Sequence, residues 1–253
     1  VTFQTSFHIP LSQITVLITF NFLVQLTVDA LSAGMIDRIG YRASIILAHI
    51  FSAAGLLLLA VLPELLPNAF AGLLISVCVY AIGGGLIEVL VSPIIEACPT
   101  DHKEKAMSLL HSFYCWGQVG VVLLSTIFFA LFGISNWKVL AFLWALLPAF
   151  NLFLFAKAPL YSLHGDGAKG LTIRELFSRK VFWVFMLMMV SAGASEQSVS
   201  QWASTFAEQG LGVSKAVGDL AGPMAFAALM GTARLIYGRY GDRINLDRFM
   251  KYN

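Results

Sequence analysis

The sequence AGMIDRIGYR, residues 33–42, lies at the junction of two long apolar segments, residues 12–36 and 43–63. Each segment is long enough to cross the hydrocarbon core of a bilayer, which takes about 20 residues. The charged residues of this short sequence would then lie in a tight turn at one membrane surface. The sequence therefore predicts two consecutive transmembrane helices joined at residues 37–42.

Further apolar segments follow the first two along the rest of the chain. Hydrophobic residues make up 58% of the sequence and charged residues only 12%, whereas a soluble domain has about 25% charged residues. The deficit indicates a surface that faces lipid. We therefore expect an all-α membrane protein with seven transmembrane helices, the later five near residues 69–95, 107–133, 137–157, 181–207 and 217–238.

The distribution of Lys and Arg between the loops predicts the orientation of these helices. Thirteen of the sixteen basic residues lie in alternate loops, and the loops on the other face hold two. Basic loops remain on the cytoplasmic side, which indicates a multi-pass protein, most simply of the plasma membrane. The loops predicted to be cytoplasmic are 37–42, 96–106, 157–180 and 239–253.

The charged turn after the first segment has a second copy near the end of the chain. Asp37-Arg38-Ile39 follows the first segment, and Asp242-Arg243-Ile244 follows the last. By the loop assignment, each copy lies on the same face after a helix that runs inward. The sequence therefore predicts an internal repeat.

These residues resemble the loop motif G-x-x-x-D-R-x-G-R/K-R/K of the major facilitator superfamily of transporters. Asp37, Arg38, Gly40 and Arg42 match the motif, whereas Ala33 and Tyr41 depart from it. The resemblance implies two six-helix halves of which this chain contains helices two to eight. It implies an N-terminal bundle (1–157) without its first helix, a cytoplasmic linker with a short surface helix (158–180), and the beginning of a C-terminal bundle (181–253).

Two further stretches resemble the fucose-type sugar:proton symporters of this superfamily. They are residues 83–88, which end in Glu88, and residues 111–117. This resemblance implies a secondary active transporter that moves a small polar solute, a sugar or a related compound, by proton-coupled alternating access. The alternative is an efflux transporter for amphiphilic or drug-like compounds, although residues 116–122 lack the proline of the corresponding drug-antiporter motif.

Polar residues recur along one face of four of the predicted helices. Polar side chains inside a membrane are costly unless they face a partner or a wet cavity. Each stripe alone could hold two helices together, but four stripes favour a shared cavity near the midplane. The candidate substrate-binding residues are Gln25, Trp116, Gln118, Glu196, Gln201 and Trp202.

Glu88 is the candidate for proton coupling. A permanently ionised carboxylate within the predicted helix 69–95 would be expensive without a partner. Glu88 could therefore be neutral in one gate state and charged in another, which would link a proton to alternating access. We also expect the glycines of residues 83–85 and Pro93 to make this helix deformable.

Charged and small residues at the cytoplasmic ends of the helices are predicted to form gates and the repeated motif. Asp29 and Arg234 occupy equivalent places in the two copies of the repeat; a structural ion pair is the alternative role for each. The set comprises Asp29, Asp37, Arg38, Gly40, Arg42, Arg234, Gly238, Asp242 and Arg243.

The sequence also excludes several classes of protein. It has no His-Glu-x-x-His pair and no Gly-x-Ser-x-Gly elbow, so we predict no enzyme, no catalytic residues, no metal and no cofactor. A net charge of +2 without a separate basic patch argues against a nucleic-acid partner. The expected partners are the lipid bilayer, a small-molecule solute and a proton.

Overall fold

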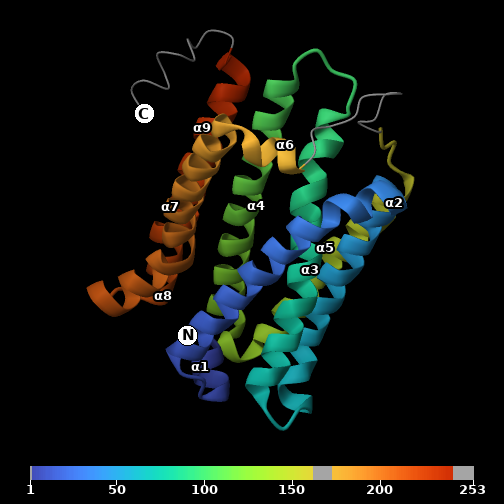
Figure 1. Ribbon diagram of the computed structural model, residues 1–253. Coiled ribbons are helices and arrows are strands. Elements are labelled where there is room, and N and C mark those ends of the chain that lie inside the picture. Colours follow the sequence, from blue (N-terminus) through green and yellow to red (C-terminus); the bar gives the residue numbers. More distant parts are fainter. Residues whose placement is uncertain (1, 162–172, 242–253) are drawn as a thin grey trace. The chain divides into compact units, whose positions relative to one another are not determined.

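The computed structural model of the chain describes residues 2–161 and 173–241, which form helices and the turns between them (Figure 1). These residues contain no β-strand, which confirms the predicted all-α fold. The helices are α1 (Thr2–Phe7), α2 (Leu11–Leu65), α3 (Ala69–Glu96), α4 (Lys103–Phe132), η1 (Ile134–Asn136), α5 (Trp137–Lys157), α6 (Ile173–Ser178), α7 (Lys180–Leu211), α8 (Lys215–Asp219), η2 (Leu220–Met224) and α9 (Ala225–Tyr240).

Within the described residues, six helical segments are long and apolar enough to cross a membrane. They correspond to six of the seven predicted spans, so the chain is a multi-pass integral membrane protein. The remaining predicted span, 181–207, is a continuous helix, α7, but it is not among the six. Its second half contains Glu196, Gln201 and Glu208, which lower the mean hydropathy of the helix.

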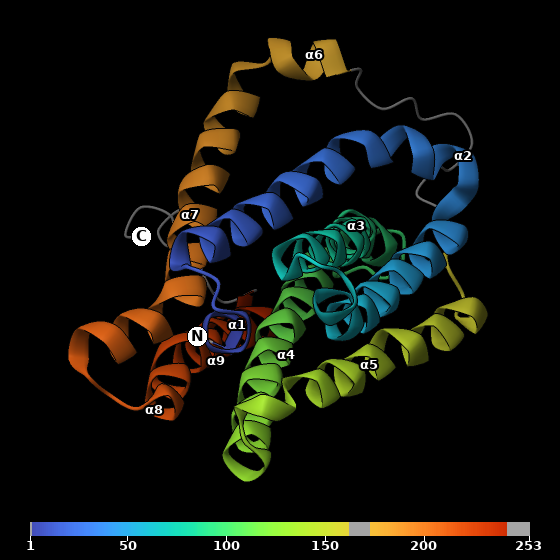
Figure 2. The same cartoon turned by 90° about the horizontal axis from the view of Figure 1, so that it is seen from below.

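The predicted turn between the first two spans is a sharp bend within α2. Gly40 has φ 82° and ψ 160°, values outside the helical region, so Leu11–Ser32 and Arg38–Leu65 are separate membrane spans. A residue with a Cβ atom adopts this positive φ only with strain. Figure 2 shows α2 changing direction between its two spans. The glycine of the motif is therefore required by backbone conformation.

The helices form two compact units. The first unit comprises Val1–Thr100 and Phe128–Leu163, and the second unit comprises Asp101–Ile127 and His164–Asn253. These units differ from the predicted bundles, since residues 101–127 group with the later part of the chain. The predicted domain boundaries at 157/158 and 180/181 stay a prediction. The short helix predicted after Thr172 is α6.

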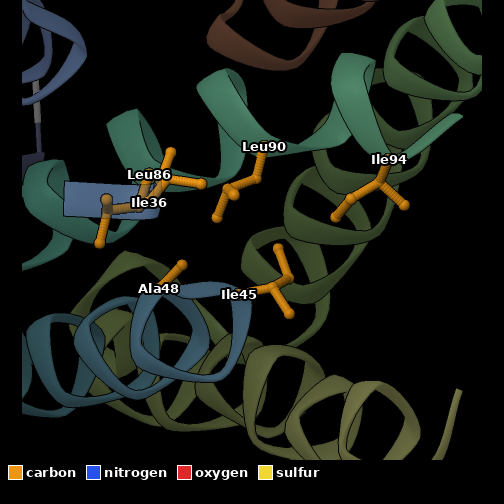
Figure 3. Packing of buried hydrophobic residues seen from close by; sticks show 6 residues of the cluster. All are labelled: Ile36, Ile45, Ala48, Leu86, Leu90 and Ile94. Atoms are coloured by element: carbon orange, nitrogen blue, oxygen red, sulfur yellow. The ribbon is translucent and has the colours of Figure 1, made fainter. Parts of the chain in front are cut away.

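An apolar core holds α2 and α3 together in the first unit. Figure 3 shows the buried side chains from the second span of α2 facing those of α3. A Cβ atom on Gly83 would lie 2.7 Å from the carbonyl oxygen of Ala48, so the two backbones approach more closely than any larger residue allows. The core consists of Ile36, Ile45, Ala48, Leu86, Leu90 and Ile94.

α3 is a continuous helix from Ala69 to Glu96, through both the glycines of residues 83–85 and Pro93. We expected these residues to make the helix deformable. Two of the glycines have a packing role, since Gly83 lies against α2 at Ala48 and Gly85 lies against α2 at Val28. The deformability of α3 stays a prediction.

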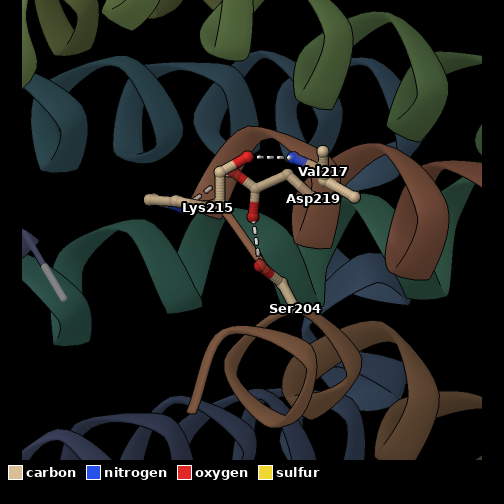
Figure 4. A network of polar contacts seen from close by, with 5 residues as sticks. Ser204, Lys215, Val217 and Asp219 are labelled. Atoms are coloured by element: carbon tan, nitrogen blue, oxygen red, sulfur yellow. Dashed lines mark hydrogen bonds and ion pairs between the residues drawn. The ribbon is translucent and has the colours of Figure 1, made fainter. Parts of the chain in front are cut away.

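A network of polar contacts connects α7 to α8 in the second unit (Figure 4). The Asp219 carboxylate accepts hydrogen bonds from the Ser204 hydroxyl and from the Lys215 ammonium, the latter at 2.7 Å. Ser214 caps the start of α8 by accepting a bond from the Val217 amide at 3.4 Å. These contacts hold the short helix against the end of α7.

Candidate functional site

Three of the predicted residues lie along the contact between α2 and α3 in the first unit. A Cβ atom on Gly84 would lie 3.0 Å from the Gln25 side-chain nitrogen, which places Gln25 directly over the glycine-rich stretch. One turn further along, the charges of Asp29 and Glu88 interact. The structure therefore brings Gln25, Asp29 and Glu88 together on one pair of helices.

The exposure of the two carboxylates differs. Glu88 is exposed, whereas Asp29 is half-buried. The Asp29 Oδ1 atom is buried and accepts no hydrogen bond from the described residues. Two adjacent carboxylates disfavour simultaneous ionisation in a membrane.

Three helices of the second unit meet around Arg234. The Arg234 Nη2 atom lies 3.9 Å from the Glu196 Oε2 atom, so α9 is paired with α7. Both charges act on His111 and Cys115 of α4. The Ser108 hydroxyl donates to the backbone oxygen of Arg234 at 2.9 Å. A cation, an anion and an imidazole thus face one another between α4, α7 and α9.

Trp116 lies beside this charged group. A Cβ atom on Gly231 would lie 2.9 Å from the Cys115 Cβ atom and 3.3 Å from the indole nitrogen of Trp116. Gly231 precedes Arg234 by about one helical turn. The absence of a side chain at Gly231 therefore lets α4 approach α9 and places the indole about one turn of α9 from Arg234.

The other predicted substrate-binding residues of the second unit lie apart from this group. Gln118 is half-buried, and its Oε1 atom has no hydrogen-bond partner among the described residues. Gln201 and Trp202 are exposed on α7. The predicted cavity shared by Gln25, Glu88, Gln118, Glu196 and Gln201 involves both compact units and stays a prediction.

A cavity of about 320 Å³ lies between α2 and α5 in the first unit, and its lining is entirely apolar. Leu57 contributes from α2, and Phe142 and Leu143 contribute from α5. None of the predicted substrate-binding residues lines it. Without polar groups to fix a polar solute, this cavity does not match the expected site.

The motif residues of the first copy have distinct places in the structure. The Arg42 guanidinium donates hydrogen bonds to the carbonyl oxygens of Phe155, Ala156 and Ala158, at 3.0, 2.6 and 2.8 Å. These carbonyls belong to the C-terminal end of α5, where a cation complements the helix dipole. Arg42 therefore fastens the start of the second span to the end of α5.

The other motif residues come from the first copy and from the second copy of the repeat. Arg38 is exposed, and the side chain of Asp37 lies outside the described part of the chain. A Cβ atom on Gly238 would lie 3.7 Å from the Ser108 Oγ atom, so Gly238 faces α4. Asp242 and Arg243 lie outside the described residues. Their gate roles, like those of Asp29 and Arg234, stay predictions.

Sequence reasoning missed two of the contacts described above. The spacing of Lys215 and Asp219, four residues apart, was a sufficient signal for their ion pair. The pairing of Glu196 with Arg234 had no such signal, because 38 residues and a change of helix direction separate the two. Within the described part of the chain, no group of three or more His, Cys, Asp or Glu residues could hold a metal ion.

The comparisons with known proteins identify the family. A family model described as Major Facilitator Superfamily matches residues 1–252. No curated protein and no solved structure matches the chain. Members of this family are transporters rather than enzymes. Given the six membrane-spanning helices and the match over nearly its whole length, the chain belongs to the Major Facilitator Superfamily of secondary transporters.

Proposed function

We propose that the protein is a proton-coupled transporter for a small polar solute, a sugar or a related compound, of the fucose-symporter type. The observation that carries this proposal is the placement of polar groups along contacts between the long helices. Gln25, Asp29 and Glu88 share one contact, and Glu196, Arg234 and Trp116 share another.

Such groups provide the interactions that a sugar requires. Amides and carboxylates hydrogen-bond to hydroxyl groups, and an indole offers a flat surface for the apolar face of a sugar ring. Transporters of this architecture bind their solutes near the midplane, between repeats. Gln25, Gln118, Gln201 and Trp202 are the remaining members of the proposed binding set.

Glu88 is proposed to carry the coupled proton. It is exposed within the first unit and its charge interacts with that of Asp29. Neutralisation of one carboxylate removes the repulsion between the two, so proton uptake would change the contact between α2 and α3. A conformational preference that depends on protonation is what coupling requires.

The test is solute uptake into proteoliposomes that contain the intact protein under an imposed pH gradient. We expect labelled fucose or glucose to accumulate when the outside is acidic. Glu88→Gln should abolish accumulation and leave solute exchange across the membrane in place. Glu104→Gln is the matched control, because Glu104 is exposed in the first turn of α4.

Two results would contradict the proposal in different ways. Accumulation that survives Glu88→Gln, with unchanged dependence on the gradient, would remove Glu88 from the coupling step. Extrusion of an amphiphilic dye, without uptake of any sugar, would replace the proposed function by the efflux alternative.

A further inference from the structure

Among the described residues, the guanidinium of Arg234 has few partners for a cation inside a membrane-spanning segment, Lys215–Tyr240. A guanidinium has five N–H donors. Within the described part of the chain, its recorded side-chain contacts are one bond to the Met230 sulfur at 3.6 Å and the ion pair with Glu196 at 3.9 Å. The latter exceeds the range of a hydrogen bond. Most of the donors are therefore available to a ligand.

The surroundings of Arg234 define the ligand further. Its side chain is 32% exposed, and that of Glu196 is 26% exposed, so the pair is accessible without being fully solvated. Trp116 lies against α9 about one turn away and is 39% exposed. A ligand at this place meets a cation at one end and an aromatic surface beside it.

We propose that Arg234 binds the carboxylate of a sugar acid whose ring packs on Trp116, and that Glu196 is the counter-ion of Arg234 when the ligand is absent. This inference rests on the proposed transport of a sugar-like solute and names its chemical class. A guanidinium favours bidentate hydrogen bonding to a carboxylate, and a ligand carboxylate can provide it. Glu196 does not form such bonds, because its Oε2 atom lies 3.9 Å from the Arg234 Nη2 atom.

The charges of the group favour a carboxylate over a phosphate. Arg234 and Glu196 together carry no net charge, so a bound carboxylate adds one negative charge, which one proton neutralises. A phosphate dianion would require two protons, or a net charge inside the membrane, which is costly. The titratable groups of α4 that interact with the charges of this pair are His111 and Cys115.

The first experiment compares labelled D-glucuronate with D-glucose in proteoliposomes that contain the intact protein. The inference predicts that glucuronate is taken up at least about tenfold faster than glucose, since one charge-assisted hydrogen bond contributes this much. Uptake of glucose without glucuronate would overturn the inference and leave the proposed function standing. Uptake of neither of these two solutes, nor of labelled fucose, would overturn both.

The second experiment separates ligand binding from a structural ion pair. Arg234→Gln should weaken glucuronate binding about 10- to 100-fold. Arg234→Lys should weaken it less, because the positive charge remains, although the bidentate hydrogen bonds of the guanidinium are lost. Glu196→Gln should keep binding or strengthen it a few-fold, since the competing carboxylate is gone. Arg239→Gln is the matched control, because Arg239 lies exposed on the same helix.

Opposite effects of Arg234→Gln and Glu196→Gln on glucuronate binding distinguish a ligand-binding arginine from a purely structural ion pair. A purely structural pair predicts that Arg234→Gln and Glu196→Gln lose binding together and lower the thermal stability in detergent equally. That result would overturn the inference. Glu196→Gln retains the arginine, so the inference remains testable even if Arg234→Gln does not fold.

Discussion

The two compact units hold their helices together in different ways. In the first unit, α2 and α3 meet through small residues and an apolar core. In the second unit, α4, α7 and α9 meet through an ion pair and a hydroxyl group, in addition to the close approach of α4 to α9 at Gly231. Among the described residues, all the buried hydrophobic side chains belong to the first unit except Cys115 and Ala227.

This difference has a physical consequence for a protein in lipid. Since lipid tails are as apolar as Leu, helices associate there through close packing and polar bonds rather than through the hydrophobic effect. The first unit relies on packing, which tolerates little change in volume. The second unit adds a few polar contacts to its close packing at Gly231, and polar groups can exchange partners.

The largest effect should come from Gly83→Ala, which places a Cβ atom 2.7 Å from the Ala48 carbonyl oxygen. Overpacking of this kind costs about 1–3 kcal/mol, and a clash with backbone lies at the upper end. The measurement is thermal unfolding in detergent. The matched control is Gly120→Ala, since nothing lies within 4 Å of a Cβ atom there. Equal destabilisation by both substitutions would contradict the packing account.

Arg42→Gln should have the second largest effect, because it removes three hydrogen bonds to the end of α5. We expect a loss of about 1–2 kcal/mol, in view of the exposure of the arginine. Arg42→Lys should recover only part of this lost stability, since Lys lacks the several N–H donors of a planar guanidinium. Arg38→Gln serves as the comparison at an exposed position. A similar loss at Arg38 would show that only the loop charge matters.

In the second unit, Asp219→Asn should cost about 1 kcal/mol, because it weakens the bonds to Ser204 and Lys215. The loss should be local and should raise the hydrogen exchange of residues 215–224 while α4 is unaffected. A double-mutant cycle with Ser204→Ala measures the coupling, expected at about 1 kcal/mol. Additive effects of the two substitutions would refute the described contact.

The smallest effect should come from Glu64→Gln in the first unit. Glu64 pairs with Lys138, but its side chain is 58% exposed. Exposed ion pairs contribute about 0–1 kcal/mol. We expect a change of less than about 0.5 kcal/mol in detergent, and none at high salt. A loss comparable with that of Gly83→Ala would mean that ion pairs also hold the first unit together.

Local sequence was sufficient to predict much of this structure. Apolar length and loop charges are local properties, so the helical spans followed from them, and the glycine of the motif does make a turn at Gly40. The seventh predicted span, 181–207, also rested on the length of an apolar segment. α7 is a helix there, but polar residues occupy its second half.

The amino-acid sequence by itself determined the fold class, the family and the types of polar residue that lie in the spans, because each depends on residues close together in the chain. Only the tertiary structure decided which of these residues meet. Glu196 pairs with Arg234, Gln25 lies over Gly84, and Arg42 reaches the end of α5. These partners depend on how whole helices rotate and slide against one another, and that is set by side-chain packing over the entire contact.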